Sequence, residues 1–219
     1  MAAAWIGFAG GVIAVAVSTW VAIRQSRLER EEKAEEVLRR YREPLAAAAF
    51  DLQSRLYNIL RKKFFEKYGK GERAEEALTS TLFRLAQYFG WSEILRRDIQ
   101  FLSFPEDEDT RKVADLQAKI AGRFLTDELG QGLMIWSDEQ RALGELMIVE
   151  EHGKVLCMGY AKFCDDPDGT FAPWLKRLRQ QLSDPYTPGR MREVQHLLCE
   201  LVETLDSSRL RYTENLDRA

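Results

Sequence analysis

The first 23 residues of the chain, Met1 to Ile23, contain no Asp, Glu, Lys, Arg or His. About 20 predominantly apolar residues in a helix are enough to cross the hydrocarbon core of a bilayer. A cleaved signal peptide is the alternative, but such a peptide begins with a positively charged region, and Met1 to Trp5 carry no basic side chain. The sequence therefore predicts a single uncleaved transmembrane anchor at residues 1–23.

Basic residues follow this run at once, with Arg24 and Arg27 as the first two. Because cytoplasmic flanks of membrane helices are enriched in Lys and Arg, we expect the N-terminus outside and the body in the cytoplasm. Trp5 and Trp20 lie near the two ends of the run, where interfacial aromatic residues are common. These features predict that the chain is located in a plasma membrane.

Small residues recur along one face of the expected anchor at spacings of four, three and four. They are Gly7, Gly11, Ala14 and Ser18. Small residues let membrane helices approach closely and associate, so we expect a homo-oligomer that forms through this face. The same face could instead line a pore in a larger ring, and this alternative stays open.

Histidine and cysteine are scarce, with two and three residues respectively. Metal sites need several converging His, Cys or carboxylate ligands, and the cysteines have no C-x-x-C spacing, which fits reduced thiols. The sequence also lacks a P-loop, a G-x-S-x-G motif and an H-E-x-x-H motif. We predict no metal site and no cofactor, and we expect a non-enzymatic protein while leaving enzyme activity open.

Proline is also scarce, at six residues, whereas Leu, Ala, Glu and Arg are abundant. These four residues favour helices, so we predict an all-α fold with a multi-helix bundle as the body. The net charge of −3 gives no case for nucleic-acid binding. The body is long enough for one sizeable core.

The chain divides into four predicted parts: the anchor at 1–23, a charged juxtamembrane helical stalk at 24–43, a cytoplasmic α-helical domain at 44–206 and a frayed polar tail at 207–219. Pro44 is expected to end the stalk helix, because proline disfavours a helix at the residue before it. Within the domain, we expect helices over residues 45–67, 74–89, 92–102, 111–125, 137–152, 154–163, 171–182 and 189–205.

Apolar residues recur at helical spacing in the first and last of these helices. The first stripe contains Leu45, Ala48, Ala49, Leu52, Leu56 and Ile59, and the last contains Val194, Leu197, Leu198, Leu201, Val202 and Leu205. Such stripes predict faces buried in one core. Asp51 and Arg55 are four residues apart, which is typical of a surface pair or of a polar patch that binds a partner.

Basic residues gather at the end of the helix that follows Pro44, at Arg61, Lys62 and Lys63. Cations near a helix C-terminus interact favourably with the helix dipole. With Arg24 and Arg27, they could instead contact anionic lipid headgroups. We therefore keep membrane lipids among the expected partners, together with an unidentified cytoplasmic protein.

Two resemblances concern function. Arg190, Arg192 and His196 have a spacing that resembles the arginine–histidine pair of the helical HEPN ribonucleases, which implies that the His would act in RNA cleavage at a dimer interface. The segments at Tyr41–Leu45, Phe50–Tyr57 and Asp138–Leu146 resemble a group of bacterial proteins with an N-terminal membrane helix and a cytoplasmic helical body. That second resemblance implies an inner-membrane setting and transfers no activity.

These observations lead to three expectations for function. The first is a single-pass, self-associating helical interaction or sensor protein without enzyme activity. The second is a membrane effector whose oligomers form a pore, and the third is a membrane-anchored ribonuclease related to the HEPN proteins.

Overall fold

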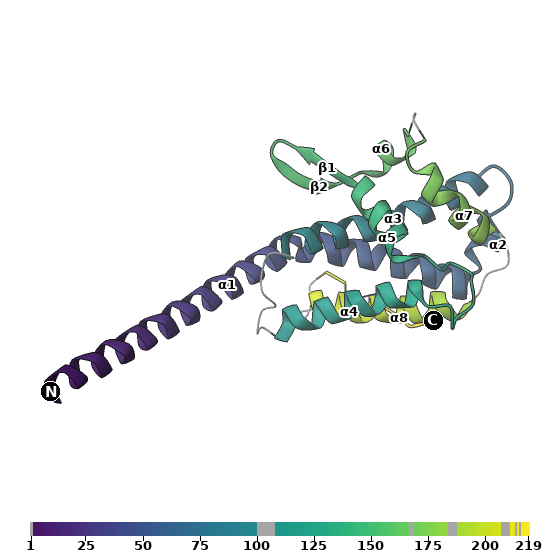
Figure 1. Cartoon of the computed structure of the whole chain (residues 1–219). Helices are drawn as coiled ribbons and strands as arrows, with labels where there is room; N and C mark the ends of the chain where they lie inside the picture. Colours follow the sequence, from purple (N-terminus) through teal and green to yellow (C-terminus); the bar gives the residue numbers. More distant parts are fainter. Residues whose placement is uncertain are drawn as a thin grey trace.

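The structure is a computed structural model that describes residues 2–99, 108–166, 169–183, 188–206, 211, 212, 214 and 216–219. These residues form eight α-helices and one two-stranded antiparallel sheet (Figure 1). The elements are α1 Ala2–Lys62, α2 Phe64–Tyr68, α3 Ala74–Ile99, α4 Glu108–Leu125, α5 Ser137–Leu146, β1 Ile148–Glu151, β2 Lys154–Cys157, α6 Tyr160–Cys164, α7 Ala172–Ser183 and α8 Pro188–Leu205. The prediction of a largely helical bundle is confirmed.

Helix α1 has 61 residues and runs without a break through Pro44. The prediction that Pro44 ends the stalk helix is therefore wrong. Contacts hold the helix just before the proline: the Tyr41 hydroxyl donates to Asp98 of α3 at 2.7 Å, and Arg42 Nη2 donates to the Thr204 carbonyl of α8 at 3.1 Å. Leu45 follows Pro44 and is fully buried. This packing compensates for the hydrogen bond that proline cannot make.

The N-terminal part of α1 extends well beyond the body (Figure 1). The first side chains that the structure describes are exposed, and Trp20 and Ile23 keep 59% and 52% of their accessible surface. Among the residues whose side chains are described, no helix is long and apolar enough to cross a membrane. The structure does not describe the side chains of most of the predicted anchor, which include Gly7, Gly11, Ala14 and Ser18. The side chain of Arg27 also lies outside the described part of the chain.

The core of the body forms where α1 packs against α3 and α8, and where α8 also packs against α4. Figure 1 shows α4 and α8 side by side beneath the second half of α1. The predicted stripes are confirmed for Leu45, Leu52 and Leu56 of α1, all buried, and for Val194 and Leu198 of α8, which are fully buried. Burying apolar surface of this kind is the main favourable contribution to folding.

Helix α3 continues through Gly90, where the sequence predicted a break between two helices. A Cβ at Gly90 would lie 2.7 Å from Cys157 Sγ and 2.8 Å from Met147 Cβ. At Gly144 of α5, a Cβ would lie 2.7 Å from the Phe89 carbonyl oxygen. These two glycines therefore let α3 approach α5 and β2 closely, and neither of them interrupts a helix.

Strands β1 and β2 form a hairpin in which Glu151 pairs with Lys154. Helices were predicted over this region, from residue 137 to 152 and from 154 to 163, and both boundaries are wrong. The two-residue turn consists of His152 at φ 53° and Gly153 at φ 73°, and two positive φ values in succession suit a tight hairpin turn. Of the helix predicted over residues 154–163, the structure has only the short α6 at the C-terminal end.

The described part of the C-terminal tail packs against the body, contrary to the prediction that it frays. The Tyr212 and Phe50 rings lie 4.8 Å apart between centroids. Ala219 is 5% exposed, and its backbone N–H donates to Gln195 Oε1 at 3.0 Å. Gln195 Nε2 in turn donates to Gln53 Oε1 of α1 at 3.1 Å. The tail therefore joins a buried polar network between α1 and α8.

Candidate functional site

Arg190 lies in the first turn of α8 and is fully buried. Its Nε donates to the Gly132 carbonyl at 2.9 Å, and its two Nη atoms donate to the carbonyls of Arg123, Phe124, Thr126 and Gly130. All five N–H groups of the guanidinium therefore have acceptors within the chain. Burial lowers the pKa of Arg190. The last carbonyls of α4, which lack helical partners, receive donors from this one side chain.

The other two residues of the ribonuclease resemblance do not join Arg190 at a shared cavity. Arg192 is exposed. His196 is half-buried, and its Nε2 lies 2.9 Å from the Ala219 carbonyl oxygen. The arrangement gives Arg190 a structural role, and it brings no acid–base pair to a cavity.

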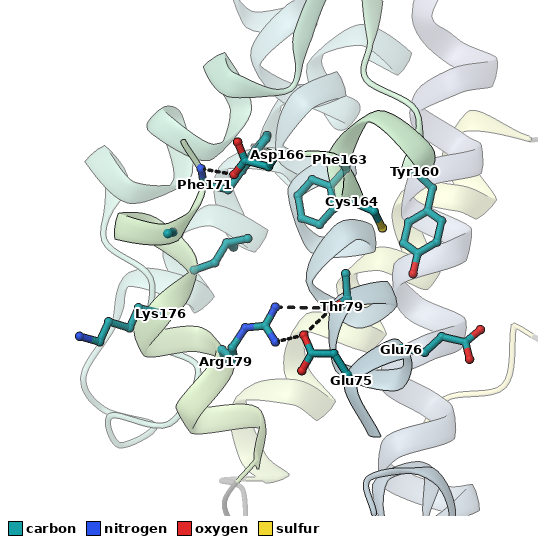
Figure 2. Close-up of a pocket in the computed structure, with 12 residues that line it drawn as sticks. Glu75, Glu76, Thr79, Tyr160, Phe163, Cys164, Asp166, Phe171, Lys176 and Arg179 are labelled. Carbon is teal, nitrogen blue, oxygen red and sulfur yellow. Dashed lines mark hydrogen bonds and ion pairs between the residues drawn. The ribbon is translucent and has the colours of Figure 1, made fainter. Parts of the chain in front are cut away.

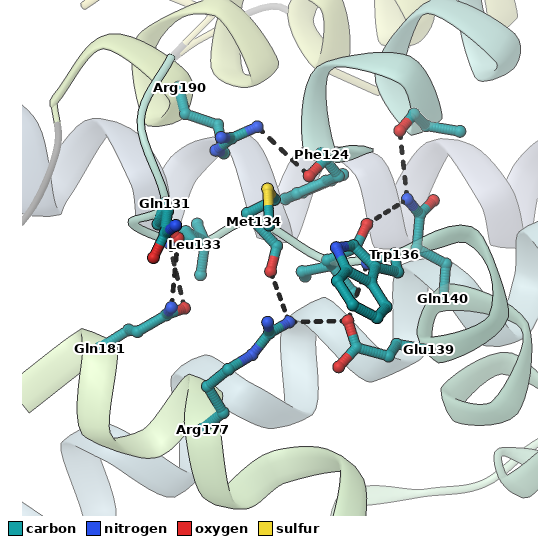
Figure 3. Close-up of polar contacts among 12 residues, drawn as sticks. Phe124, Gln131, Leu133, Met134, Trp136, Glu139, Gln140, Arg177, Gln181 and Arg190 are labelled. Carbon is teal, nitrogen blue, oxygen red and sulfur yellow. Dashed lines mark hydrogen bonds and ion pairs between the residues drawn. The ribbon is translucent and has the colours of Figure 1, made fainter. Parts of the chain in front are cut away.

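The same arginine helps to fix the loop between α4 and α5, residues 126–136, from the α8 side (Figure 3). Arg177 and Gln181 hold this loop from α7. Arg177 Nη2 lies 2.7 Å from both the Met134 carbonyl and Glu139 Oε2, and Gln181 Nε2 donates to the Gln131 carbonyl at 3.1 Å. Side chains of α7 and α8 therefore hold the loop that connects α4 to α5.

The basic end of α1 contains Arg61 and Lys62, and Lys63 follows with a left-handed φ of 55°. Lys63 Nζ pairs with Glu66 at 3.0 Å, an exposed contact. Because α1 is continuous and rises 1.5 Å per residue, Lys62 lies about 58 Å along the helix from Ile23. A lipid contact at both ends of this distance would require α1 to lie along the membrane surface.

A pocket of about 630 Å³ lies between α3, α6 and α7. We call it the α6–α7 pocket. Its apolar wall comes from Phe163, Phe171 and Leu175. Figure 2 shows Arg179 reaching across the pocket to Glu75 and Thr79, whereas Lys176 points away. An apolar wall with a few polar groups at its rim is typical of a ligand pocket.

Two titratable groups at the rim of the α6–α7 pocket have shifted pKa values. Hydrogen bonds from the backbone N–H groups of Phe171 and Thr170, at 3.0 and 2.9 Å, lower the pKa of Asp166. Burial, together with the neighbouring Cys164, raises the pKa of Tyr160. Asp166 thus stays ionised as a cap at the start of α7, and Tyr160 stays neutral at ordinary pH.

The second pocket, of about 320 Å³, lies where α1, α2 and α3 meet, and it shares Glu76 with the first. We call it the Arg55 pocket. Its lining combines two arginines, two aromatic rings, one acidic residue and two small residues: Arg55, Arg73, Phe64, Tyr68, Glu76, Ala77 and Ser80. Two guanidinium groups beside aromatic faces are suited to an anionic ligand.

Arg55 is 9% exposed, and its guanidinium lies 3.9 Å from the centre of the Phe64 ring. Its Nη1 donates to Thr81 Oγ1 at 3.2 Å. Burial and the nearby charge of Arg84 lower the pKa of Arg55 to about 10. The expected surface pair with Asp51 does not form, because Asp51 lies 3.8 Å from Arg84 instead. Among the described residues, no carboxylate is at ion-pair distance from Arg55.

Sequence reasoning missed the role of Arg55, although a signal was present. Leu52, Leu56 and Ile59 are buried around it at helical spacing, so Arg55 lies on the apolar stripe. A charged residue on a core-facing stripe is rarely left buried without a partner. The partners that complete the pocket come from residues 64–80 and could not be assigned from spacing alone.

The described residues contain no group of three or more His, Cys, Asp and Glu side chains that could hold a metal ion. Neither pocket has a histidine in its lining. Comparison of the chain with models of protein families, with curated proteins and with solved structures found no match.

Proposed function

We propose that the protein is a single-pass, membrane-anchored and self-associating helical interaction protein whose body binds a ligand or partner. The observation that carries the proposal is the continuity of α1. One helix begins at Ala2, extends beyond the body and then becomes a central core helix. The first 23 residues of the chain carry no charged side chain, which suits a segment in a bilayer.

The test of the anchor compares the full chain with a chain that lacks residues 1–23, expressed in bacteria. We expect the full chain to stay in the membrane fraction after alkaline carbonate extraction and the shortened body to be released. Release of both chains by carbonate would contradict the proposal.

The orientation can be tested with a cysteine that the protein already has. Cys164 is exposed, whereas Cys199 is buried and Cys157 is half-buried. A membrane-impermeant maleimide should leave Cys164 unmodified in intact spheroplasts and modify it after lysis. A Cys164→Ser variant is the control. Modification of Cys164 in intact spheroplasts would place the body outside the cytoplasm and contradict this part of the proposal.

Self-association is tested on the detergent-solubilised full chain by mass measurement. Gly7→Leu with Gly11→Leu fills the small-residue face and should lower the oligomer mass. The matched control, Ala9→Leu with Ala16→Leu, adds bulk to the opposite face of the helix and should leave the mass unchanged. Equal oligomer masses for the two double variants would contradict association through the small-residue face.

A further inference from the structure

We propose that the Arg55 pocket binds the phosphate group of a small, water-soluble phosphate monoester, with Arg55 as its principal ligand. The phosphate site concerns the body alone, and only the choice of a soluble ligand over a lipid headgroup rests on the proposed membrane anchor. It begins from a difference between the two most deeply buried arginines of the described residues. Arg190 has five carbonyl acceptors, whereas Arg55 has one hydroxyl acceptor and an aromatic ring.

A buried charge without a partner is strongly unfavourable unless another group compensates for it. Arg55 is nine-tenths buried and lines the pocket. Because its guanidinium lies over the Phe64 ring, the N–H groups point outward around the edge of the guanidinium plane. Thr81 uses one of them. An oxyanion in the pocket would supply further acceptors and a negative charge at ion-pair distance from Arg55.

The two arginines of the lining favour an anionic ligand. Arg73 lines the pocket with Arg55, and Glu76 is the acidic residue in the lining. Arg84 also acts on Arg55, but it lies 3.8 Å from Asp51. Guanidinium groups form paired hydrogen bonds to phosphate oxygens, and a phosphate monoester offers two arginines more acceptor oxygens than a single carboxylate does.

The dimensions and position of the pocket favour a small soluble ligand. Its volume of about 320 Å³ is at the lower end for small-molecule sites. The rings of Phe64 and Tyr68 can pack against the organic part of such a ligand. Arg55 lies about 48 Å along α1 from Ile23, so a helix that crosses the bilayer steeply keeps the pocket away from lipid headgroups.

The test titrates the detergent-solubilised full chain with inorganic phosphate and with phenyl phosphate by calorimetry, at constant ionic strength set with chloride. We expect saturable binding of one ligand per chain, with phenyl phosphate the tighter of the two. Arg55→Gln should weaken binding about tenfold or more, because charge-assisted hydrogen bonds are lost. The matched control Arg61→Gln removes an exposed charge from the same helix and should change affinity by less than about twofold.

A second variant of Arg55 and a lipid ligand complete the test. Arg55→Lys keeps the charge but loses the forked geometry of the guanidinium, so it should also weaken binding. This variant provides the test if Arg55→Gln does not fold. Vesicles with phosphatidate headgroups test the lipid source of the same chemistry. The proposal is overturned if the wild-type chain shows no saturable binding in the millimolar range, if the Arg55 variants bind as tightly as wild type, or if only the vesicles bind.

Discussion

Arg190 Nη1 in α8 donates a 3.2 Å hydrogen bond to the carbonyl oxygen of Phe124, the penultimate residue of α4. This contact is one of five that tie the start of α8 to the end of α4 and to the loop that follows it. A cation at a helix N-terminus is unfavourable in the field of its own helix. The carbonyls at the C-terminal end of α4 reverse that effect.

We therefore expect Arg190→Met to destabilise the protein by about 3 kcal/mol or more, because several buried carbonyls lose their donor. The measurement is urea unfolding of the full chain followed by circular dichroism. Arg192→Met, on the exposed side of the same turn, is the control and should stay within about 0.5 kcal/mol of wild type. Similar losses in both variants would show that burial of Arg190 is not what matters.

Arg55 gives the opposite expectation in the absence of an anion. Arg55→Met removes a buried charge that has no carboxylate partner and replaces it with a flexible apolar side chain. We expect unfolding stability in phosphate-free buffer to stay equal or to rise by up to about 1 kcal/mol. Thr81 keeps its own 2.7 Å hydrogen bond to the Ala77 carbonyl. A loss of stability as large as that of Arg190→Met would mean that Arg55 is already compensated within the chain.

The glycines of α4 and α5 make a matched pair. At Gly144, an added Cβ would lie 2.7 Å from the Phe89 carbonyl oxygen, which is backbone and cannot rotate away. At Gly122 of α4, an added Cβ would meet nothing within 4 Å. We expect Gly144→Ala to cost about 1–3 kcal/mol through strain and Gly122→Ala to add about 0.5–1 kcal/mol. Thermal unfolding would show the opposite signs, and a gain at both positions would argue against the close approach of α3 and α5.

The thiols predict a pH dependence. Burial raises the pKa of Cys157 to about 12 and that of Cys199 to about 11. In the unfolded chain these thiols ionise near pH 8.5–9, so above that pH the unfolded state binds fewer protons than the folded state. Stability is therefore fully present below about pH 8.5 and is lost as the pH rises toward 11–12.

A colorimetric thiol reagent at pH 8 checks the same point in the native state. We expect one fast thiol, Cys164, and two slow ones, with all three reacting quickly in urea. Urea midpoints at pH 8 and pH 10 then give the sign of the stability change. Three fast thiols in the folded protein, or a higher midpoint at pH 10, would contradict the buried environment of Cys157 and Cys199.

The apolar stripes could be predicted from the sequence because helical spacing reports directly on burial. Leu52 and Leu198 are inside as expected. Trp174 of α7 is 37% exposed, although Leu175 and Leu178 of the same helix are buried. Periodicity identifies a face, but the width of the contact decides how much of a large ring is covered.

The two expected breaks in helices failed for a different reason. Pro44 and Gly90 disfavour a helix locally, but tertiary contacts on both sides of each residue outweigh that preference. The helix prediction over residues 148–157 was wrong because short runs of this composition are compatible with either secondary structure, and the turn at His152 and Gly153 is not one of the Asn-Gly or Asp-Gly pairs that identify a hairpin in a sequence.

The two pockets could not be predicted at all, because their walls join residues that are far apart in the chain. Arg55 and Arg73 approach the same space from different elements, and Tyr160 reaches Glu76 from α6. Spacing rules describe neighbours on one helix. They say nothing about which helices cross, and the crossing determines the site.

Helix α1 has a mechanical consequence that its length alone does not suggest. The projecting N-terminal part of α1 and its core part are one continuous helix. A rotation or axial shift of the N-terminal part must be transmitted past Pro44 or must displace α1 against α3 and α8. Arg55 lies on the same helix, about three turns beyond Pro44. A force on the N-terminal part of α1 and ligand binding in the Arg55 pocket therefore act on the same helix.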